Sequence, residues 1–518
     1  MPFSSLSSRC SSHSIHIPDV PGASFHSLQA SLVTNLSSYV GEYYYLNHKS
    51  VQIDNLSFCN VSLAYMHRDQ TDQTNVQVWL PIDTWNGRMM GVGGGGWQAG
   101  LYPENFMAMQ GAIGQGYAAV STDGGHSADQ NLSDWLLTTH GDIDYSSLNN
   151  FAAISLSDTS IIGKSIIKSF YGNSPKYSYW SGCSQGGRQG LVLAQRYPEA
   201  YDGIVASAPA INWSEFLVGG FWPQFIMNQL DAYPLSCELD FITNAAVASC
   251  DGRDGVEDGI ISNGDLCNFD PYSLIGTTLN CDGRWLNISR AAADIAMAAW
   301  LGPISTNGIS LWHGVGLDSN LTSPSSIAST HCYSNETCIG SPNILSSEWI
   351  QVGIARHPGF NLRNLTHAQY VQVFETSVQQ YGPIIGTHDP DLTAFRDRGG
   401  KLLTYHGLAD PIIPYKSTRQ YYQAVASIDP DVRQFFRLFE APGMGHCWSM
   451  SGLYPSTIFD AMVSWVEEGV VPENLPAVFS DRDGVNYERI ICPYPEQAVY
   501  NGHGDPTMKS SFYCLAGR

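Results

Sequence analysis

The chain has 518 residues, 43% of them hydrophobic, which is enough to bury a full core and too apolar for a disordered protein. Lys and Arg total 25 against 47 Asp and Glu, a formal net charge of -22. This charge repels phosphate backbones, so we expect no nucleic-acid partner. No stretch approaches the roughly 20 apolar residues that span a bilayer, so we expect no membrane partner. The sequence indicates no oligomeric state.

The first 210 residues are predicted to alternate between short strands and amphipathic helices. Apolar runs with turn residues at their ends predict strands, and apolar residues at helical spacing predict helices. The expected strands are 75–81, 88–92, 117–122 and 177–180, and the expected helices are 151–171 and a segment running through 195. This β-α-β order predicts a mainly parallel sheet with helices on its faces.

The alternation stops between about residues 212 and 389, where cysteines, Asp-Gly pairs and Ser-rich connectors are dense. We interpret this stretch as an inserted domain. Strands at 401–405 and 434–439 and helices at 417–427 and 456–468 then resume the earlier pattern. The predicted organisation is therefore a main domain formed by 1–211 and 390–518, interrupted by a lid domain, 212–389.

Gly182-Cys183-Ser184-Gln185-Gly186 is a G-x-S-x-G motif between a predicted strand and a predicted helix. A nucleophile elbow needs small residues two before and two after its serine, because the turn is too tight for side chains there. The motif in this context favours an α/β-hydrolase fold with Ser184 as nucleophile. The alternative is an ordinary strand-to-helix turn.

In α/β hydrolases the acid and then the histidine follow the serine, each after a later strand. Asp410 stands just past the strand at 401–405, and His446 stands in a Gly-rich loop after the strand at 434–439. We expect His446 to take the Ser184 proton while Asp410 orients the imidazole, so that an acyl-enzyme forms and is hydrolysed. The alternatives are a turn-capping aspartate, a packing histidine, or His406 as the base.

An oxyanion hole is also required. One donor should be the backbone N–H of Gln185, the residue after the nucleophile. The other should come from the glycines of 93–97, with Gly95 as the predicted donor, because this loop follows an early strand. A flexible turn without catalytic function is the alternative for this loop.

Cys183 directly precedes the serine and Cys447 directly follows the histidine, so a disulfide between them is sterically plausible if the serine and histidine meet. This pattern of Cys-Ser, Asp and His-Cys resembles the fungal tannase and feruloyl esterase family across essentially the whole chain. The resemblance implies secreted serine esterases with an α/β-hydrolase domain and a large lid. It also implies a disulfide between Cys183 and Cys447 beside the triad.

Three aspartates at spacings of three and four, Asp251, Asp254 and Asp258, are separated by glycines in the predicted lid. They can converge on a hard cation that prefers oxygen ligands, and Ca²⁺ is the expected cofactor. The family resemblance implies that the backbone carbonyls of Val256 and Ile260 complete the site. A solvated acidic turn is the alternative.

The remaining cysteines and the sequons indicate an oxidising, glycosylating compartment. Cys250 and Cys267 flank the acidic loop; Cys10 with Cys59, Cys492 with Cys514 and Cys332 with Cys338 are further expected pairs, Cys237 and Cys281 remain, and the pairing of Cys237, Cys281, Cys332 and Cys338 stays open. Nine sequons begin at Asn35, Asn55, Asn60, Asn131, Asn212, Asn287, Asn320, Asn335 and Asn364. We expect a secreted protein whose signal peptide is not visible in this chain.

The expected activity is carboxylesterase action on hydroxycinnamic esters, with a small phenolic or plant cell-wall ester as substrate. A tannase or a secondary-metabolite esterase of the same family is the nearest alternative. A non-catalytic binding protein would have lost a member of the triad, and Ser184, Asp410 and His446 are all present. A cluster of five aromatic residues could line an acyl pocket or belong to the core: Trp213, Phe216, Phe221, Trp222 and Phe225.

Overall fold

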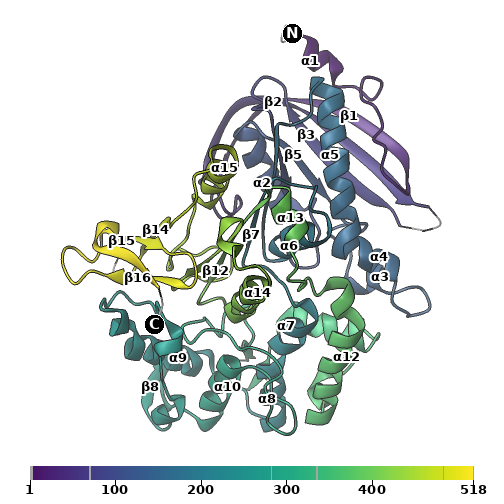
Figure 1. Ribbon diagram of the computed structural model, residues 1–518. Coiled ribbons are helices and arrows are strands. Elements are labelled where there is room, and N and C mark those ends of the chain that lie inside the picture. Colours follow the sequence, from purple (N-terminus) through teal and green to yellow (C-terminus); the bar gives the residue numbers. More distant parts are fainter. Residues whose placement is uncertain are drawn as a thin grey trace.

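The computed structural model describes residues 4–68, 70, 72–281, 283–333, 337–481 and 484–516. Its centre is a nine-stranded sheet in the order β1-β2-β3-β5-β4-β6-β7-β12-β13 (Figure 1). The strands are β1 (Ala23–Val40), β2 (Val51–His67), β3 (Thr74–Pro81), β4 (Arg88–Val92), β5 (Ala118–Thr122), β6 (Tyr177–Cys183), β7 (Gly203–Ser207), β12 (Lys401–Gly407) and β13 (Phe436–Ala441). The strands predicted from the sequence are present. Those starting at Tyr177 and Lys401 are longer than expected, and the one expected at 434–439 begins two residues later.

The sheet is mixed, and the expected parallel pairing holds for most of its strand pairs. The pairs β1/β2, β2/β3 and β3/β5 are antiparallel, whereas the five pairs from β5/β4 to β12/β13 are parallel. The first two strands, 18 and 17 residues long, were missed. β1 is the outer strand of the sheet and is largely exposed or half-buried, so the apolar signal of a buried strand is weak there.

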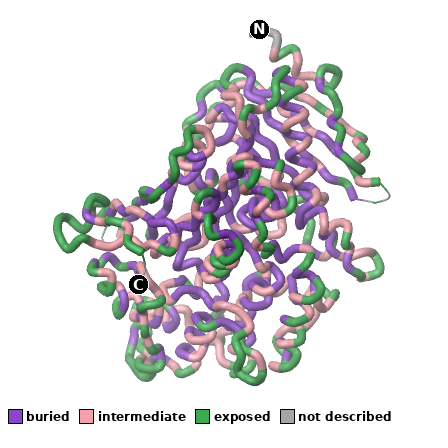
Figure 2. The backbone as a smooth tube through the Cα atoms, viewed as in Figure 1, coloured by how far each residue is buried: buried purple, intermediate pink, exposed green. Residues whose placement is uncertain are grey.

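Helices cover both faces of the parallel part. Its strands send alternate side chains to opposite faces: Tyr179 and Trp180 of β6 belong to different apolar clusters. The helices α5 (Ser155–Tyr171), α6 (Gln185–Arg196) and α14 (Tyr415–Ile428) contribute to one cluster, and α2 (Pro103–Gly114) and α15 (Ile458–Glu468) to the other. Buried backbone accordingly runs through the middle of the molecule (Figure 2).

The segment between β7 and β12 contributes no described strand to the large sheet, although these two strands pair with each other in parallel. It is mainly helical, which was not predicted from the sequence. Its helices are α7 (Trp213–Gly220), α8 (Trp222–Leu230), α9 (Ser236–Cys250), α10 (Arg290–Leu301), α11 (Ile344–Glu348) and α12 (His367–Ile385), with the hairpins β8 (Thr278–Cys281)–β9 (Arg284–Asn287) and β10 (Thr330–Cys332)–β11 (Cys338–Gly340). These elements lie together below the sheet in Figure 1.

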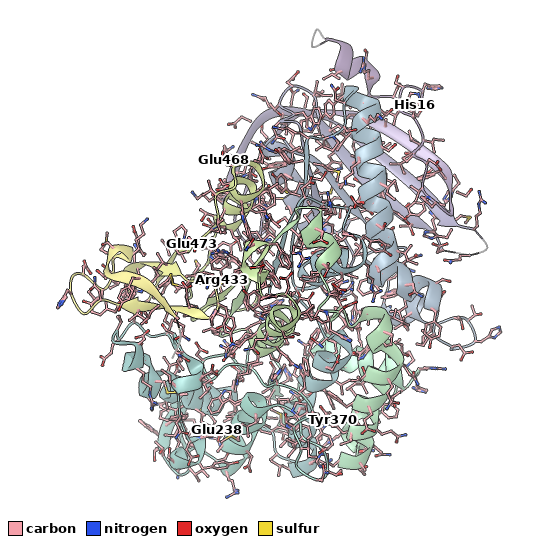
Figure 3. The ribbon with its side chains drawn as sticks, in the orientation of Figure 1. His16, Glu238, Tyr370, Arg433, Glu468 and Glu473 are labelled. Atoms are coloured by element: carbon pink, nitrogen blue, oxygen red, sulfur yellow. A yellow bond between two sulfur atoms is a disulfide. The ribbon has the colours of Figure 1, made fainter. Side chains whose placement is uncertain are left out.

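Buried polar side chains link the helices of this segment (Figure 3). The Glu238 carboxylate accepts hydrogen bonds from the N–H groups of Leu235 at 3.1 Å and Ser289 at 2.9 Å, joining the starts of α9 and α10. The Tyr370 hydroxyl of α12 donates to the Val218 carbonyl of α7 at 2.9 Å.

The chain ends in two hairpins, β14 (Leu475–Ser480)–β15 (Asn486–Ile491) and β16 (Glu496–Tyr500)–β17 (Phe512–Ala516). They lie beside the end of α9 (Figure 1), and the buried Arg489 of β15 pairs with Asp258 at 2.7 Å. The smaller helices are α1 (Ser4–Arg9), α3 (Leu132–Leu136), α4 (Tyr145–Asn149) and α13 (Thr393–Asp397). No described helix is long and apolar enough to cross a membrane.

Candidate active site

Ser184 occupies a strained turn between β6 and α6. Its backbone has φ 61° and ψ -121°, a region that costs a non-glycine residue about 1–3 kcal/mol. A Cβ at Gly182 would approach the Gly186 carbonyl carbon to 2.5 Å, so the first glycine of the motif is required. Ser184 is partly exposed, whereas its neighbours 181–183 and 185–190 are buried. The turn therefore has the geometry of a nucleophile elbow.

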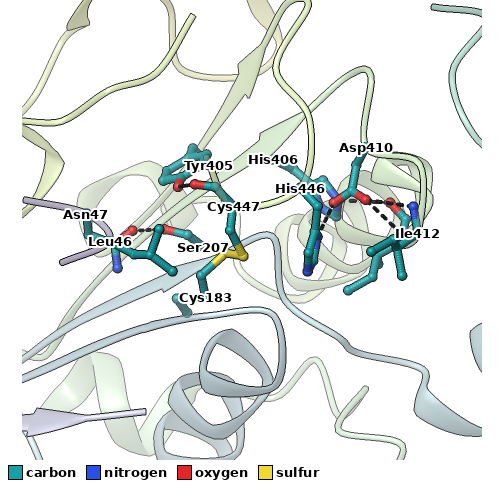
Figure 4. The surroundings of a disulfide bond; sticks show 12 residues. Leu46, Asn47, Cys183, Ser207, Tyr405, His406, Asp410, Ile412, His446 and Cys447 are labelled. Carbon is teal, nitrogen blue, oxygen red and sulfur yellow. Dashed lines mark hydrogen bonds and ion pairs between the residues drawn. A yellow bond between two sulfur atoms is a disulfide. The ribbon is translucent and has the colours of Figure 1, made fainter. Parts of the chain in front are cut away.

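Asp410 and His446 meet at the ends of β12 and β13. The His446 Nδ1 lies 2.7 Å from Asp410 Oδ2, as expected from the sequence (Figure 4). The N–H groups of Ile412 and Ile413 donate to the other Asp410 oxygen at 2.9 and 3.0 Å. Burial alone would raise the pKa of the Asp410 carboxyl, but His446 and His406 outweigh burial and lower this pKa well below its usual range. An ionised, fixed carboxylate thus holds one imidazole nitrogen of His446.

His406, the rival base, is fully buried. Its Nδ1 lies 2.8 Å from the Thr418 hydroxyl, and its Nε2 lies 3.1 Å from the Ile413 carbonyl and 3.3 Å from Asp410 Oδ2. Both ring nitrogens are occupied by these contacts. His406 therefore contacts the Asp410 carboxylate and is not available to act as the base.

A disulfide joins Cys183, before the serine, to Cys447, after the histidine (Figure 4). Ser184, His446 and both cysteines line one cavity of about 630 Å³. Since neighbouring residues are bridged covalently, the histidine loop is fixed against the elbow. Ser184 and His446 thus line the same cavity.

The glycine loop after β4 lies against the elbow. The Gln189 side chain of α6 accepts from the Gly94 N–H at 2.8 Å and donates to the Ala99 carbonyl at 2.9 Å. The Gly95 N–H already donates to Gln98 O at 3.1 Å, which weighs against the predicted donor. Among described residues, the amides of Gly96 and Gln185 have no hydrogen-bond acceptor. Gly96, which also lines the cavity, is the better-placed second donor.

Arg188 braces the elbow and was not singled out from the sequence. It is fully buried on α6, where its guanidinium donates to Gln185 Oε1 at 2.7 Å and to the Ala152 carbonyl at 2.9 Å. Burial lowers the pKa of Arg188 to about 9. A charged residue directly after the Gly-rich motif, in a helix whose next residues are Gln, Gly and Leu, was the available signal.

One wall of the cavity is mostly apolar and comes from the segment between β7 and β12. Of the five predicted aromatic residues only Trp213 and Phe216 line it; Phe221, Trp222 and Phe225 are buried elsewhere. The sequence reasoning missed the stretches 324–325 and 341–345 and Ile412 and Ile413, which complete the wall. No periodic pattern marks irregular chain of this kind.

The acidic loop forms a turn after α9. Some of its oxygen atoms are free to bind a cation, and others are already bonded within the protein. Asp258 Oδ1 is buried without a described hydrogen-bond partner, and the Val256 and Ile260 carbonyls accept no hydrogen bond from a described residue. However, Asp258 Oδ2 pairs with Arg489, and Asp251 accepts the Asp258 and Gly259 amides. No three His, Cys, Asp or Glu side chains of the described chain are grouped as metal ligands. The free oxygens suit a hard cation. The bonded carboxylates, in contrast, hold the turn together without one.

Twelve cysteines form six disulfides. Besides Cys183–Cys447, the pairs are Cys10–Cys59, Cys237–Cys281, Cys250–Cys267, Cys332–Cys338 and Cys492–Cys514. The expected pairs are present, and the four cysteines whose pairing the sequence left open are resolved.

Residues 29–515 match the family described as tannase and feruloyl esterase. The chain belongs to the tannase and feruloyl esterase family. A probable feruloyl esterase of Arthroderma benhamiae is 37% identical, covering 89% of this chain and 86% of the relative. The tannase of Aspergillus oryzae is 31% identical over 88% of this chain and 85% of the relative.

Solved structures of the family have the same fold. The tannin acyl hydrolase of Aspergillus niger superposes with a TM-score of 0.86 at 26% identity, covering 100% of this chain and 95% of that one. Feruloyl esterase B of Aspergillus oryzae gives 0.80 at 27% identity, covering 98% and 100%. The α/β-hydrolase fold class is thereby confirmed, and the chain is a carboxylic ester hydrolase of the family's type.

Proposed function

We propose that this chain is a secreted serine esterase that hydrolyses esters of hydroxycinnamic acids through Ser184, His446 and Asp410. The observation that carries the proposal is the 2.7 Å contact between His446 Nδ1 and Asp410 Oδ2, in a loop bridged to the residue before Ser184. With Nδ1 held by the carboxylate, Nε2 is the nitrogen left to take the serine proton.

The attack of Ser184 on the ester carbonyl would place a negative charge on its oxygen. The free amide of Gln185, at the start of α6, and that of Gly96 are the proposed donors to this oxygen. Gly96 takes the place of Gly95, which the sequence predicted as the second donor. The helix N-terminus adds a favourable field. His446 would then protonate the departing alcohol, and water would release the acid from Ser184.

The chemistry of the cavity supports a planar aromatic acyl group. Trp213 and Phe216, both almost fully buried, line the cavity, while Ile344, Leu345 and Ile413 supply further apolar contact. A flat phenolic acid would bury apolar area against such a wall, and the Ser325 and Ser341 hydroxyls on the same wall would suit its hydroxyl groups.

Initial rates on methyl ferulate, methyl caffeate, methyl p-coumarate and methyl gallate test this assignment. We expect the highest kcat/KM on a hydroxycinnamate, and a loss of at least a thousandfold in Ser184→Ala. The control is Ser157→Ala, which removes a partly exposed serine of α5 outside the cavity and should leave the rates unchanged. Activity of purified Ser184→Ala within tenfold of the wild type would overturn the proposal.

A galloyl ester hydrolase is the second candidate. It is favoured by the tannase relative at 31% identity and by the tannin acyl hydrolase structure. The same panel decides between the two, because a tannase would prefer methyl gallate over all three hydroxycinnamates.

We also propose that Asp251, Asp254 and Asp258, with the Val256 and Ile260 carbonyls, hold Ca²⁺ in a lid domain made of residues 212–389. The oxygens without partners in this turn support the proposal. A bound divalent cation would stabilise the turn that Cys250–Cys267 closes.

Secretion is proposed from the disulfides and the sequons. Six disulfides persist only in an oxidising compartment, and six of the described sequon asparagines are exposed, at Asn35, Asn55, Asn131, Asn287, Asn320 and Asn364. Asn60 and Asn212 are partly buried, and Asn335 lies outside the described residues. Glycan release followed by mass spectrometry of the native protein tests whether these asparagines carry glycans and so whether the chain passes through the secretory pathway.

A further inference from the structure

Three aromatic side chains are gathered on the surface beside the active-site cavity. Tyr43 is 59% exposed and Tyr44 is 42% exposed, and Trp448 is partly exposed. The Tyr43 ring lies edge-on to both partners, with ring centroids 5.0 Å from Tyr44 and 5.6 Å from Trp448. We call Tyr43, Tyr44 and Trp448 the aromatic platform. Exposed aromatic groups of this kind mark binding surfaces.

The platform continues the wall of the cavity. Leu46 and Cys447 both line the cavity, and Figure 4 shows Leu46 beside the disulfide. Tyr44 stands two residues before Leu46, and Trp448 directly follows Cys447. Two chain segments therefore pass from the cavity to the surface together, next to His446.

The turn that carries the two tyrosines is held rigidly. Asn47, buried with φ 74°, donates from its side chain to the Ser181 hydroxyl at 3.1 Å and accepts from the Ser207 hydroxyl at 2.6 Å. These contacts fix the turn to the ends of β6 and β7. A surface fixed in advance binds a ligand with a smaller loss of conformational entropy.

The side of the cavity identifies the part of the substrate involved. The histidine of a serine esterase gives its proton to the leaving group, so the alcohol of the ester departs next to His446. This inference rests on the proposed function. The platform therefore contacts the alcohol part of the ester, while the wall formed by 341–345 contacts the acyl group.

The chemistry of the platform selects a class of alcohol. Ring faces pack against the flat C–H face of a sugar, and the neighbouring Glu42 carboxylate and Ser449 and Ser451 hydroxyls suit its hydroxyl groups. The net charge of -22 disfavours a chain of uronic acids. We propose that the aromatic platform binds the sugar residues of a neutral carbohydrate chain that carries the ester.

The first test compares two esters of one phenolic acid, the methyl ester and the ester of a neutral xylo-oligosaccharide. For Tyr43→Ala/Tyr44→Ala, the ratio of kcat/KM on the sugar ester to that on the methyl ester should fall about tenfold, mainly through KM. Tyr145→Ala, which removes a tyrosine that is 46% exposed on α4, should keep the wild-type ratio. An unchanged ratio in the double variant would overturn the proposal.

The second test needs no turnover. Calorimetric titration of Ser184→Ala with the unesterified xylo-oligosaccharide should give binding that weakens at least tenfold when Tyr43 and Tyr44 are also replaced. Tighter binding of an oligogalacturonate, or binding that is independent of the tyrosines, would contradict a neutral-sugar surface. If the wild type hydrolysed neither ester, the proposed function would fail, and this titration would still decide whether the platform binds sugar.

Discussion

Replacing Cys183 and Cys447 by alanine should damage catalysis far more than folding. The bridge spans a sequence separation of 264 residues, for which the chain-entropy model gives about 5.6 kcal/mol, a value that measured bridges often do not reach. Catalysis depends on the bridge more directly. A displacement of about 1 Å between reacting groups can lower a rate roughly a hundredfold.

Strained backbone on both sides of the bridge supports a large loss of catalytic rate. Ser184 has φ 61° and Cys447 has φ 62°, and each costs a non-glycine residue about 1–3 kcal/mol. Without the bridge the histidine loop can relax from this conformation, since the Tyr405 hydroxyl bond to the Cys447 carbonyl is the main remaining tie at that residue. We expect kcat to fall at least a hundredfold.

The matched control is Cys492→Ala/Cys514→Ala. This bridge spans 22 residues in the C-terminal hairpins, and the same model gives about 3.4 kcal/mol. Its loss should lower the melting temperature and leave kcat within twofold. The assay is methyl-ester turnover at a temperature where circular dichroism shows each variant folded. A Cys183→Ala/Cys447→Ala protein with kcat within threefold of the wild type would refute the reasoning.

Two further predictions concern stability. His126 is buried, donates from Nε2 to the Trp97 carbonyl at 2.6 Å, and burial lowers its pKa to about 4. Because the unfolded chain binds this proton at about pH 6.5, stability should fall between pH 6.5 and 4 by up to about 3 kcal/mol from this group. Urea unfolding should show a shallower decline for His126→Gln, and an identical decline would contradict the burial effect. Removing Ca²⁺ with a chelator should lower the melting temperature by mass action, with recovery on adding Ca²⁺ and no response in Asp251→Asn. A wild type that does not respond to chelator would argue against the cation site.

The sequence was most informative where the chain is buried and regular. β3, β4 and β5 are short, mostly buried strands with several apolar residues each, and α15 has a clear apolar face that ends at Gly469, which has φ 73°. The edge strand β1 escaped prediction because it is rich in Ser and mostly exposed or half-buried. The strand β2 is paired on both sides and is largely buried, but Asn and Ser interrupt its apolar positions. For α9 a signal existed, since Leu239, Ile242, Ala246 and Cys250 recur at helical spacing and are all buried.

The sequence predicted which residues form the candidate site from their order along the chain, but it did not predict their detailed geometry. Strand ends in a parallel sheet meet at one edge, so Asp410 and His446 could be named from their places after β12 and β13. The choice between Gly95 and Gly96 depends on the turn bond from Gly95 to Gln98, which composition does not reveal. The cavity wall formed by 324–325 and 341–345 could not be named either, because its position depends on how irregular chain between β7 and β12 folds.

Covalent trapping of the nucleophile tests the central claim most directly. The protein is treated with a fluorophosphonate, digested, and mapped by mass spectrometry beside the His446→Ala variant. We predict one equivalent of label on the peptide carrying Ser184, loss of esterase activity in proportion to labelling, and little labelling of His446→Ala. Complete labelling at another serine, or full activity after Ser184 is labelled, would contradict the account.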